Sequence, residues 1–159
     1  AKITGSVIWL SEAYSYHKQN LMLNPNSYGK VARTLFRAGG LFSSGDYIQA
    51  QRMRSRIKRE LEEIHKKVDL IVTPTYASPA ATFKDSNPLD RIMSGINFSI
   101  IFNLTGQPAI SIPIGFSKHG LPIGMQIAGR SFEEASVLKL AYAYQQQKAW
   151  FKIRPNLRD

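Results

Sequence analysis

Five stretches of the chain are predicted to be helices, from their apolar patterning and from the residues that bound them. Asn24-Pro25 ends the first stretch, and Gly39-Gly40 ends the second. Ser43 or Ser44 offers an N-cap for the third, because a serine oxygen can accept a hydrogen bond from a free N–H group of a first helical turn. The predicted helices cover residues 6–23, 28–38, 44–67, 89–104 and 131–148.

Charged residues are spread along the chain, and their densest stretch, residues 51–67, lies in the third predicted helix. Charged residues fill the positions between its apolar residues, and Glu62–Lys66 and Glu63–Lys67 have the spacing of favourable i,i+4 pairs. This pattern is typical of a helix with one solvated face. The apolar residues at helical spacing are Met53, Ile57, Leu61, Ile64 and Val68.

The last two predicted helices have their own local signals. Gly106 follows the fourth and is expected to be its C-cap. Ser131 and Glu134 have the spacing of a capping box at the start of the fifth. One face of that fifth helix is expected to carry Val137, Leu138, Ala141 and Tyr144.

Three short apolar runs predict β-strands. Residues 68–75 form a continuous apolar run that ends at a proline, and residues 109–116 and 122–129 flank a turn at 117–120. Pro113 and Gly124 weaken regular pairing and predict an edge strand or a bulge. Strands and helices together indicate an α/β fold. Three strands are too few for a doubly wound sheet, which suggests that residues outside this chain complete it.

Composition bounds the class of protein. The chain has 159 residues and no cysteine, so disulfides, thiolate zinc sites and a cysteine nucleophile are excluded. Absence of cysteine fits a reducing compartment, and we expect a cytoplasmic protein. No apolar run is long enough to cross a bilayer, so no membrane contact is expected. The net charge of +10 is spread along the chain without interleaved aromatic residues, which argues against nucleic acid as a partner.

No catalytic or metal site emerges from the residues alone. The histidines do not form an H-x-x-x-H or H-E-x-x-H spacing, and we expect no metal. There is no G-x-S-x-G elbow and no glycine-rich phosphate loop after a strand, so no cofactor is expected. Ser43-Ser44-Gly45 looks like part of a nucleophile loop, but helix capping explains it better. The three histidines are His17, His65 and His119.

Three segments, in order, resemble the C-terminal part of the amidase-signature family. The clearest is FNLTGQPAISIPIGFSKHGLPIGMQIAGRSFEEASVLKLAYAYQQ at 102–146; before it come DLIVTPT at 69–75 and the spacing from Gly45-Asp46-Tyr47 to Arg54. The resemblance implies a few strands of a mixed sheet flanked by helices. It also implies that residues 1–159 are one C-terminal segment of an amidase domain, which does not fold autonomously.

The resemblance implies a function for the whole protein. It also implies that the catalytic residues lie outside this chain. Members of this family are hydrolases that cleave amides with a serine nucleophile, a second serine in a cis peptide and a lysine base. Those residues lie in the family's N-terminal part, and no residue of this chain matches them. We therefore expect no catalytic residue in this chain and no amidase activity from it alone.

The helix before the Asn103-Leu104-Thr105-Gly106 turn contributes to the substrate pocket in this family. By that resemblance, Ile96, Ser99 and Phe102 are predicted to bind substrate, with packing in the core as the alternative. The family's glutamyl-tRNA amidotransferase A-type subunit has a substrate-binding aspartate where Ile96 stands. This difference favours a general amidase with a less polar substrate.

Three functions remain open at this point. The first is an amidase whose partners are a small-molecule amide and the N-terminal part of the same protein, with a homo-oligomer left open. The second is the A-type subunit of the amidotransferase. The third is a non-catalytic amidase-like domain that binds a partner through its basic surface.

Overall fold

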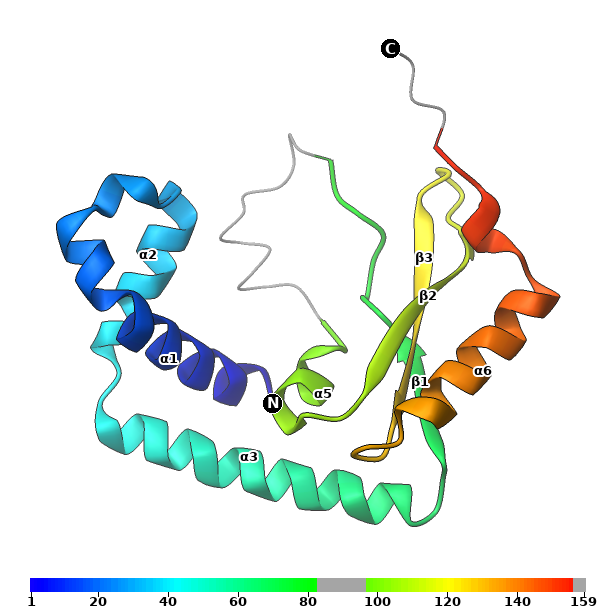
Figure 1. Ribbon diagram of the computed structural model, residues 1–159, viewed down its shortest axis with the longest axis horizontal. Helices are drawn as coiled ribbons and strands as arrows, with labels where there is room; N and C mark the ends of the chain where they lie inside the picture. The colour runs from blue at the N-terminus through cyan, green and yellow to red at the C-terminus, as the bar shows by residue number, and fades with distance from the viewer. Residues whose placement is uncertain (83–96, 156–159) are drawn as a thin grey trace.

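The computed structural model describes residues 1–82 and 97–155. Most of its helices lie on one side of a three-stranded sheet, and the last helix lies on the other side (Figure 1). The helical part comprises α1 (Lys2–Leu23), α2 (Lys30–Ala38) and α3 (Ser44–His65), with short 3-10 turns η1 (Pro25–Ser27) and η2 (Gly39–Leu41) between them. The rest comprises β1 (Leu70–Pro74), α5 (Ile100–Thr105), β2 (Ala109–Phe116), β3 (Pro122–Gly129), α6 (Glu134–Gln147) and η3 (Trp150–Lys152).

α1 and α3 lie side by side, and a small apolar cluster joins them to α5 (Figure 1). Its buried members are Ile8 of α1, Ala50 of α3 and Leu104 of α5. α1 begins at Lys2 rather than at residue 6 as predicted, because Gly5 continues the helix instead of breaking it, with its N–H donating to the carbonyl of Ala1 at 2.8 Å. These contacts place α5 against two helices that are distant from it in sequence.

The start of α3 confirms the predicted N-cap. The Ser43 hydroxyl oxygen accepts from the Asp46 N–H at 3.1 Å, and the Ser43 N–H donates to an Asp46 carboxylate oxygen at 2.9 Å. Hydrogen bonds from the Ser43 side chain and then from its backbone lower the pKa of Asp46 from its ordinary value of 3.8. Ser43 and Ser44 therefore belong to a helix start, as the sequence indicates.

Elsewhere on α3 the ion pairs differ from the prediction. Lys66 pairs with Glu63 at 2.6 Å and not with Glu62, and Arg56 pairs with Glu60 at 2.9 Å. Lys66 is the C-cap and its N–H still donates to the Glu62 carbonyl at 3.2 Å, whereas the Lys67 N–H donates to the Ile64 carbonyl at 2.9 Å, so the i,i+4 spacing is lost only from Lys67. Of the predicted apolar row, Leu61 is buried and Ile57 packs on the α1–α5 cluster, whereas Met53, Ile64 and Val68 are exposed.

The sheet has the strand order β1-β3-β2, and both pairings are antiparallel. β2 and β3 form the predicted hairpin, and its register shifts between Pro113 and Gly115, which confirms the expected bulge. The family resemblance implied a mixed sheet; among the described residues the pairing is antiparallel only. Any parallel neighbour of β1 or β2 lies outside the described ranges.

α6 covers one face of the hairpin (Figure 1). Val137 and Ala141 of α6 are buried against Ile112 of β2 and Ile127 of β3, and Tyr144 packs beside them. Leu138 is 57% exposed, so its predicted place on this face is wrong. Within the described part of the chain, no helix combines the length and apolar character that a membrane crossing requires.

The start of α6 also differs from the prediction. Its N-cap is Glu133, and Ser131 does not form a capping box with Glu134. Phe132 has φ of 66°, in the left-handed region, and the Glu133 N–H donates to the Arg130 carbonyl at 3.0 Å. This turn delays the start of the helix.

The segment before β2 is only partly described. Residues 89–96 of the predicted fourth helix lie outside the described residues, and the described helix α5 runs from Ile100 to Thr105. Gly106 follows with φ of 74° and donates its N–H to the Phe102 carbonyl at 2.8 Å, which confirms the predicted C-cap.

Candidate functional site

A wide cleft of about 1380 Å³ opens between α1, α5 and the sheet. One wall is the first half of α1, and the other consists of the last residue of β1, residues 75–81 after it, and the first residues of β3. α5 lies at the base, with Ile100 and Asn103 among the lining residues. The cleft is therefore assembled from segments that are far apart in sequence.

The α1 wall combines an aromatic ring with a carboxylate. Trp9 and Glu12 both line the cleft, one turn apart on the same helix. Glu12 accepts a hydrogen bond from the Tyr47 hydroxyl at 2.9 Å, and Gln51 donates to that hydroxyl at 2.8 Å. This chain of hydrogen bonds ties the wall to α3. No site residue was expected on this helix from the sequence, because nothing local marks one of its faces as a cleft wall.

α5 is held in place from α3. Arg54 donates from Nε to the Leu104 main-chain carbonyl at 2.6 Å, and both residues contribute to the cleft lining. The carbonyls of a helix's last turn have no partner inside the helix. Arg54 satisfies one of them and brings a positive charge to the base of the cleft.

The sheet side of the cleft has a fixed polar contact. The hydroxyls of Thr75 and Ser111 lie 2.6 Å apart, and the Thr75 N–H donates to the Gly124 carbonyl at 3.0 Å. A Cβ on Gly124 would lie 2.8 Å from the Thr75 hydroxyl oxygen and 3.0 Å from that of Ser111. Gly124 thus makes room for the two hydroxyls at the cleft wall.

The structure describes two of the three predicted substrate-binding residues. Ile96 lies outside the described residues. Ser99 is the N-cap of α5 and donates its hydroxyl to the Asn97 side-chain oxygen at 2.5 Å. Phe102 is 3% exposed and belongs to the core, whereas Ile100 and Asn103, its neighbours on α5, line the cleft. The assignment of the three residues to a pocket stays a prediction.

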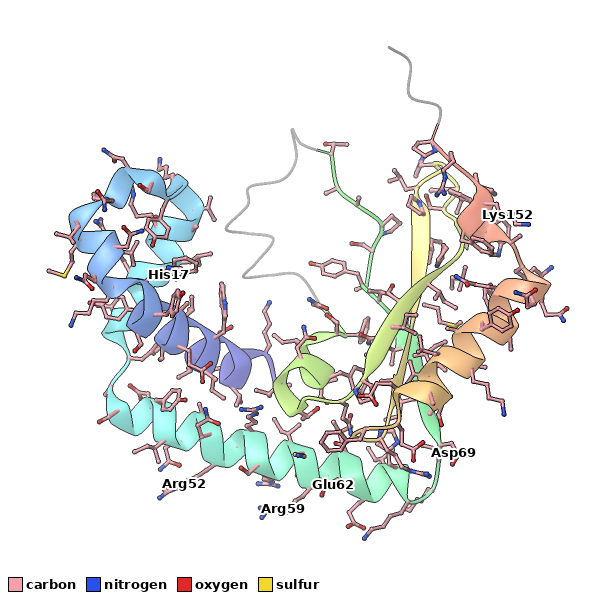
Figure 2. All side chains as sticks on the ribbon, in the orientation of Figure 1. His17, Arg52, Arg59, Glu62, Asp69 and Lys152 are labelled. Atoms are coloured by element: carbon pink, nitrogen blue, oxygen red, sulfur yellow. The ribbon has the colours of Figure 1, made fainter. Side chains whose placement is uncertain are left out.

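No histidine ring hydrogen bonds to a serine hydroxyl in the part of the chain that the structure describes. His17 contacts the Tyr28 hydroxyl at 3.0 Å and stacks on Phe36 at a centroid distance of 4.8 Å. His17 lies in the helical hairpin formed by α1 and α2, beyond the cleft-lining half of α1 (Figure 2). The described residues therefore supply walls and positioning groups around the cleft.

Comparison with known proteins places the chain in a family. The Amidase family model matches residues 11–138. The A-type subunit of glutamyl-tRNA(Gln) amidotransferase from Thermodesulfovibrio yellowstonii is 50% identical over 113 residues, which cover 70% of this chain and 23% of that protein. An amidase of Pseudomonas putida is 33% identical over 157 residues, which cover 94% of this chain and 34% of that protein.

A solved structure agrees with the fold. That of 6-aminohexanoate cyclic dimer hydrolase superposes with a TM-score of 0.76 at 20% identity, over 98% of this chain and 36% of that one. This likeness shows that the chain has part of the same fold as that structure. The chain belongs to the Amidase family. The chain spans about a third or less of the length of the relatives it matches.

Proposed function

We propose that the whole protein is an amidase that hydrolyses the C–N bond of a small carboxylic amide. The family match supports this proposal, and the cleft between α1, α5 and the sheet is the observation that carries it. Its lining is predominantly apolar with a few polar groups, which is the usual character of a small-molecule site. In this proposal the present chain supplies walls of the substrate pocket.

The chemistry is proposed to follow the family's Ser–cisSer–Lys mechanism, with all three residues outside this chain. The nucleophilic serine attacks the amide carbonyl, the lysine takes up its proton through the second serine, and backbone N–H groups stabilise the oxyanion. Nothing in this mechanism requires a cofactor. The substrate and the N-terminal part of the same protein are the proposed partners, and the proposed location is the cytoplasm.

The second candidate is the A-type subunit of the amidotransferase, which the 50% identity to the Thermodesulfovibrio yellowstonii protein favours. Two observations favour the amidase. Similarity to the Pseudomonas putida amidase extends over 94% of this chain, against 70% for the amidotransferase protein. Ile96 also stands where the family resemblance places an acidic residue in the amidotransferase, and an apolar side chain there suits a less polar substrate.

A substrate panel separates these two functions. The intact protein is assayed on glutamine and on uncharged aryl and aliphatic amides. We expect a higher kcat/KM on uncharged amides, because the cleft lining is mainly apolar and Ile96 replaces the acidic residue. Preferred hydrolysis of glutamine would favour the amidotransferase. No amide hydrolysis under any condition would favour the non-catalytic domain.

We further propose that residues 1–159 do not form an autonomous domain. Val72 on edge strand β1 is half exposed, and large apolar side chains are also exposed elsewhere, including Ile3, Leu41 and Phe132. Exposed strand edges and apolar surface promote association. Sedimentation of the isolated chain at micromolar concentration is expected to show oligomers. A monodisperse monomer with a sharp unfolding transition would contradict this proposal.

A further inference from the structure

Two half-exposed aromatic side chains line the cleft from opposite walls. Trp9 of α1 is 46% exposed, and Tyr76, two residues after β1, is 40% exposed. Both belong to the cleft lining, and no other aromatic residue does so in the part of the chain that the structure describes. α1 and the segment after β1 lie on either side of α5 (Figure 1). Each wall of the cleft therefore presents one aromatic ring.

The protein holds both rings in place. Trp9 meets Phe36 of α2 in an edge-to-face contact, with the ring centroids 6.4 Å apart and the ring planes at 75° to each other. The backbone of Tyr76 forms an antiparallel β-bridge with Asn97, shortly before α5. A ligand therefore meets aromatic surfaces whose positions are set beforehand, which lowers the entropy cost of binding.

The remaining lining favours an uncharged ligand. Two of its charged side chains already have partners, because Glu12 accepts from the Tyr47 hydroxyl at 2.9 Å and Arg54 donates to the Leu104 carbonyl at 2.6 Å. Much of the rest of the lining is small or aliphatic. These residues include Gly5, Ile8, Ala77, Ile100, Pro122 and Ile123. Recognition on such a surface depends on apolar area and on ring geometry more than on ion pairing.

We propose that the cleft selects amides that carry an aryl group, with Trp9 and Tyr76 as the residues that determine this preference. The inference rests on the proposed amidase function and names the substrate class of the same site. Aromatic rings attract one another in edge-to-face and offset-stacked arrangements, beyond the effect of the buried area. A saturated ring of the same size gains the burial and lacks this attraction.

The test compares benzamide with cyclohexanecarboxamide as substrates of the intact protein. Both carry a six-membered carbon ring on the same carboxamide group, and only benzamide is aromatic. The measured quantity is the ratio of kcat/KM for benzamide to kcat/KM for cyclohexanecarboxamide. Their difference in intrinsic reactivity cancels when this ratio is compared between a variant and the wild type.

Leucine variants remove the two aromatic rings and keep apolar side chains. Trp9→Leu and Tyr76→Leu are each expected to lower the ratio about two- to tenfold, the range that one aromatic contact supplies. Trp9→Phe retains a ring and is expected to keep most of the ratio. Thermal unfolding checks that each variant folds. Should Trp9→Leu fail to fold, Trp9→Met takes its place with the same expected loss.

Trp150→Leu is the matched control. Trp150 packs against Phe116 at a centroid distance of 6.0 Å and is outside the cleft lining, so its replacement is expected to leave the ratio unchanged. An unchanged ratio in Trp9→Leu or in Tyr76→Leu, as for rings that the N-terminal part of the protein covers, would overturn the proposal. An equal loss in Trp150→Leu, or a loss in Trp9→Phe as large as in Trp9→Leu, would also overturn it.

Binding separates the failure of this proposal from the failure of the proposed function. If the intact protein hydrolyses neither amide, the amidase function is wrong, and the dissociation constants of the same two amides are measured by NMR titration. A preference for benzamide that Trp9→Leu weakens about two- to tenfold would still support an aryl site in the cleft. The same ratio of dissociation constants in the wild type and in Trp9→Leu would overturn it.

Discussion

Arg54 and Leu104 are fifty residues apart, and the Arg54 guanidinium donates from Nε to the Leu104 main-chain carbonyl oxygen at 2.6 Å. This contact connects the middle of α3 to the last turn of α5 at the base of the cleft. We expect Arg54→Ala to lower the free energy of unfolding of the intact protein by about 1.5–3 kcal/mol, as for a hydrogen bond to a charged donor.

Arg52→Ala is the matched control for this change. Arg52 is exposed on the same helix and points away from α1 (Figure 2), so its loss should change stability by no more than about 0.5 kcal/mol. Urea unfolding compares the two variants. Equal stability of both would show that the Arg54–Leu104 contact does not hold α5 in place.

Gly39 allows η2 to approach α1 closely. An added Cβ would overlap the Leu10 carbonyl oxygen, so Gly39→Ala forces the two elements apart. We expect a loss of at least about 1–3 kcal/mol of stability. Gly45→Ala, near the start of α3, meets its nearest atom at 3.5 Å and should be neutral or stabilising by up to about 1 kcal/mol. Thermal unfolding of both variants tests this, and a fully stable Gly39→Ala protein would contradict the packing described.

The capping box of α3 predicts a pH dependence. Hydrogen bonds from Ser43 lower the pKa of Asp46 in the folded state, so Asp46 stabilises α3 fully above its unfolded pKa of 3.8. That contribution is lost as the pH falls through the lower, folded pKa. We expect Ser43→Ala to raise the Asp46 pKa, measured by NMR titration of the carboxyl carbon. An unchanged pKa would show that the Ser43 hydroxyl does not donate to the Asp46 carboxylate in solution.

Two neighbours on α5 should respond differently to truncation, if the cleft is the substrate site. Phe102 is in the core, and Phe102→Ala is expected to cost about 3–5 kcal/mol of stability. Ile100 lines the cleft, and Ile100→Ala should change the ratio of kcat/KM between amides of different acyl size by about 10–200-fold. If Phe102→Ala stays stable and shifts substrate preference more, Phe102 belongs to the pocket, as the sequence predicted.

Local signals in the sequence predicted local structure well. Ser43 caps α3, Gly106 ends α5 in the left-handed conformation, and the bulge in the hairpin follows Pro113. Each of these depends on a residue with a restricted or unusual backbone preference and on its near neighbours. Such preferences act within one turn of chain, so a single sequence reveals them.

Features that depend on distant contacts were not predictable in the same way. Ser131 has the residue type and spacing of an N-cap, but the turn at Phe132 moves the start of α6 to Glu134. His65 lies among charged neighbours in sequence and is nonetheless buried. The Trp9 face of α1 becomes a cleft wall only because α3 and α5 place it opposite the sheet.

This chain is proposed to supply walls of an amidase site whose catalytic residues lie outside it. The most direct measurement is hydrolysis of an uncharged aryl amide by the purified 159-residue chain, alone and mixed with the separately produced N-terminal part. We predict no turnover above buffer for the chain alone and recovered turnover for the mixture. Turnover by the chain alone that disappears when a single serine within it is replaced would contradict this division of the site.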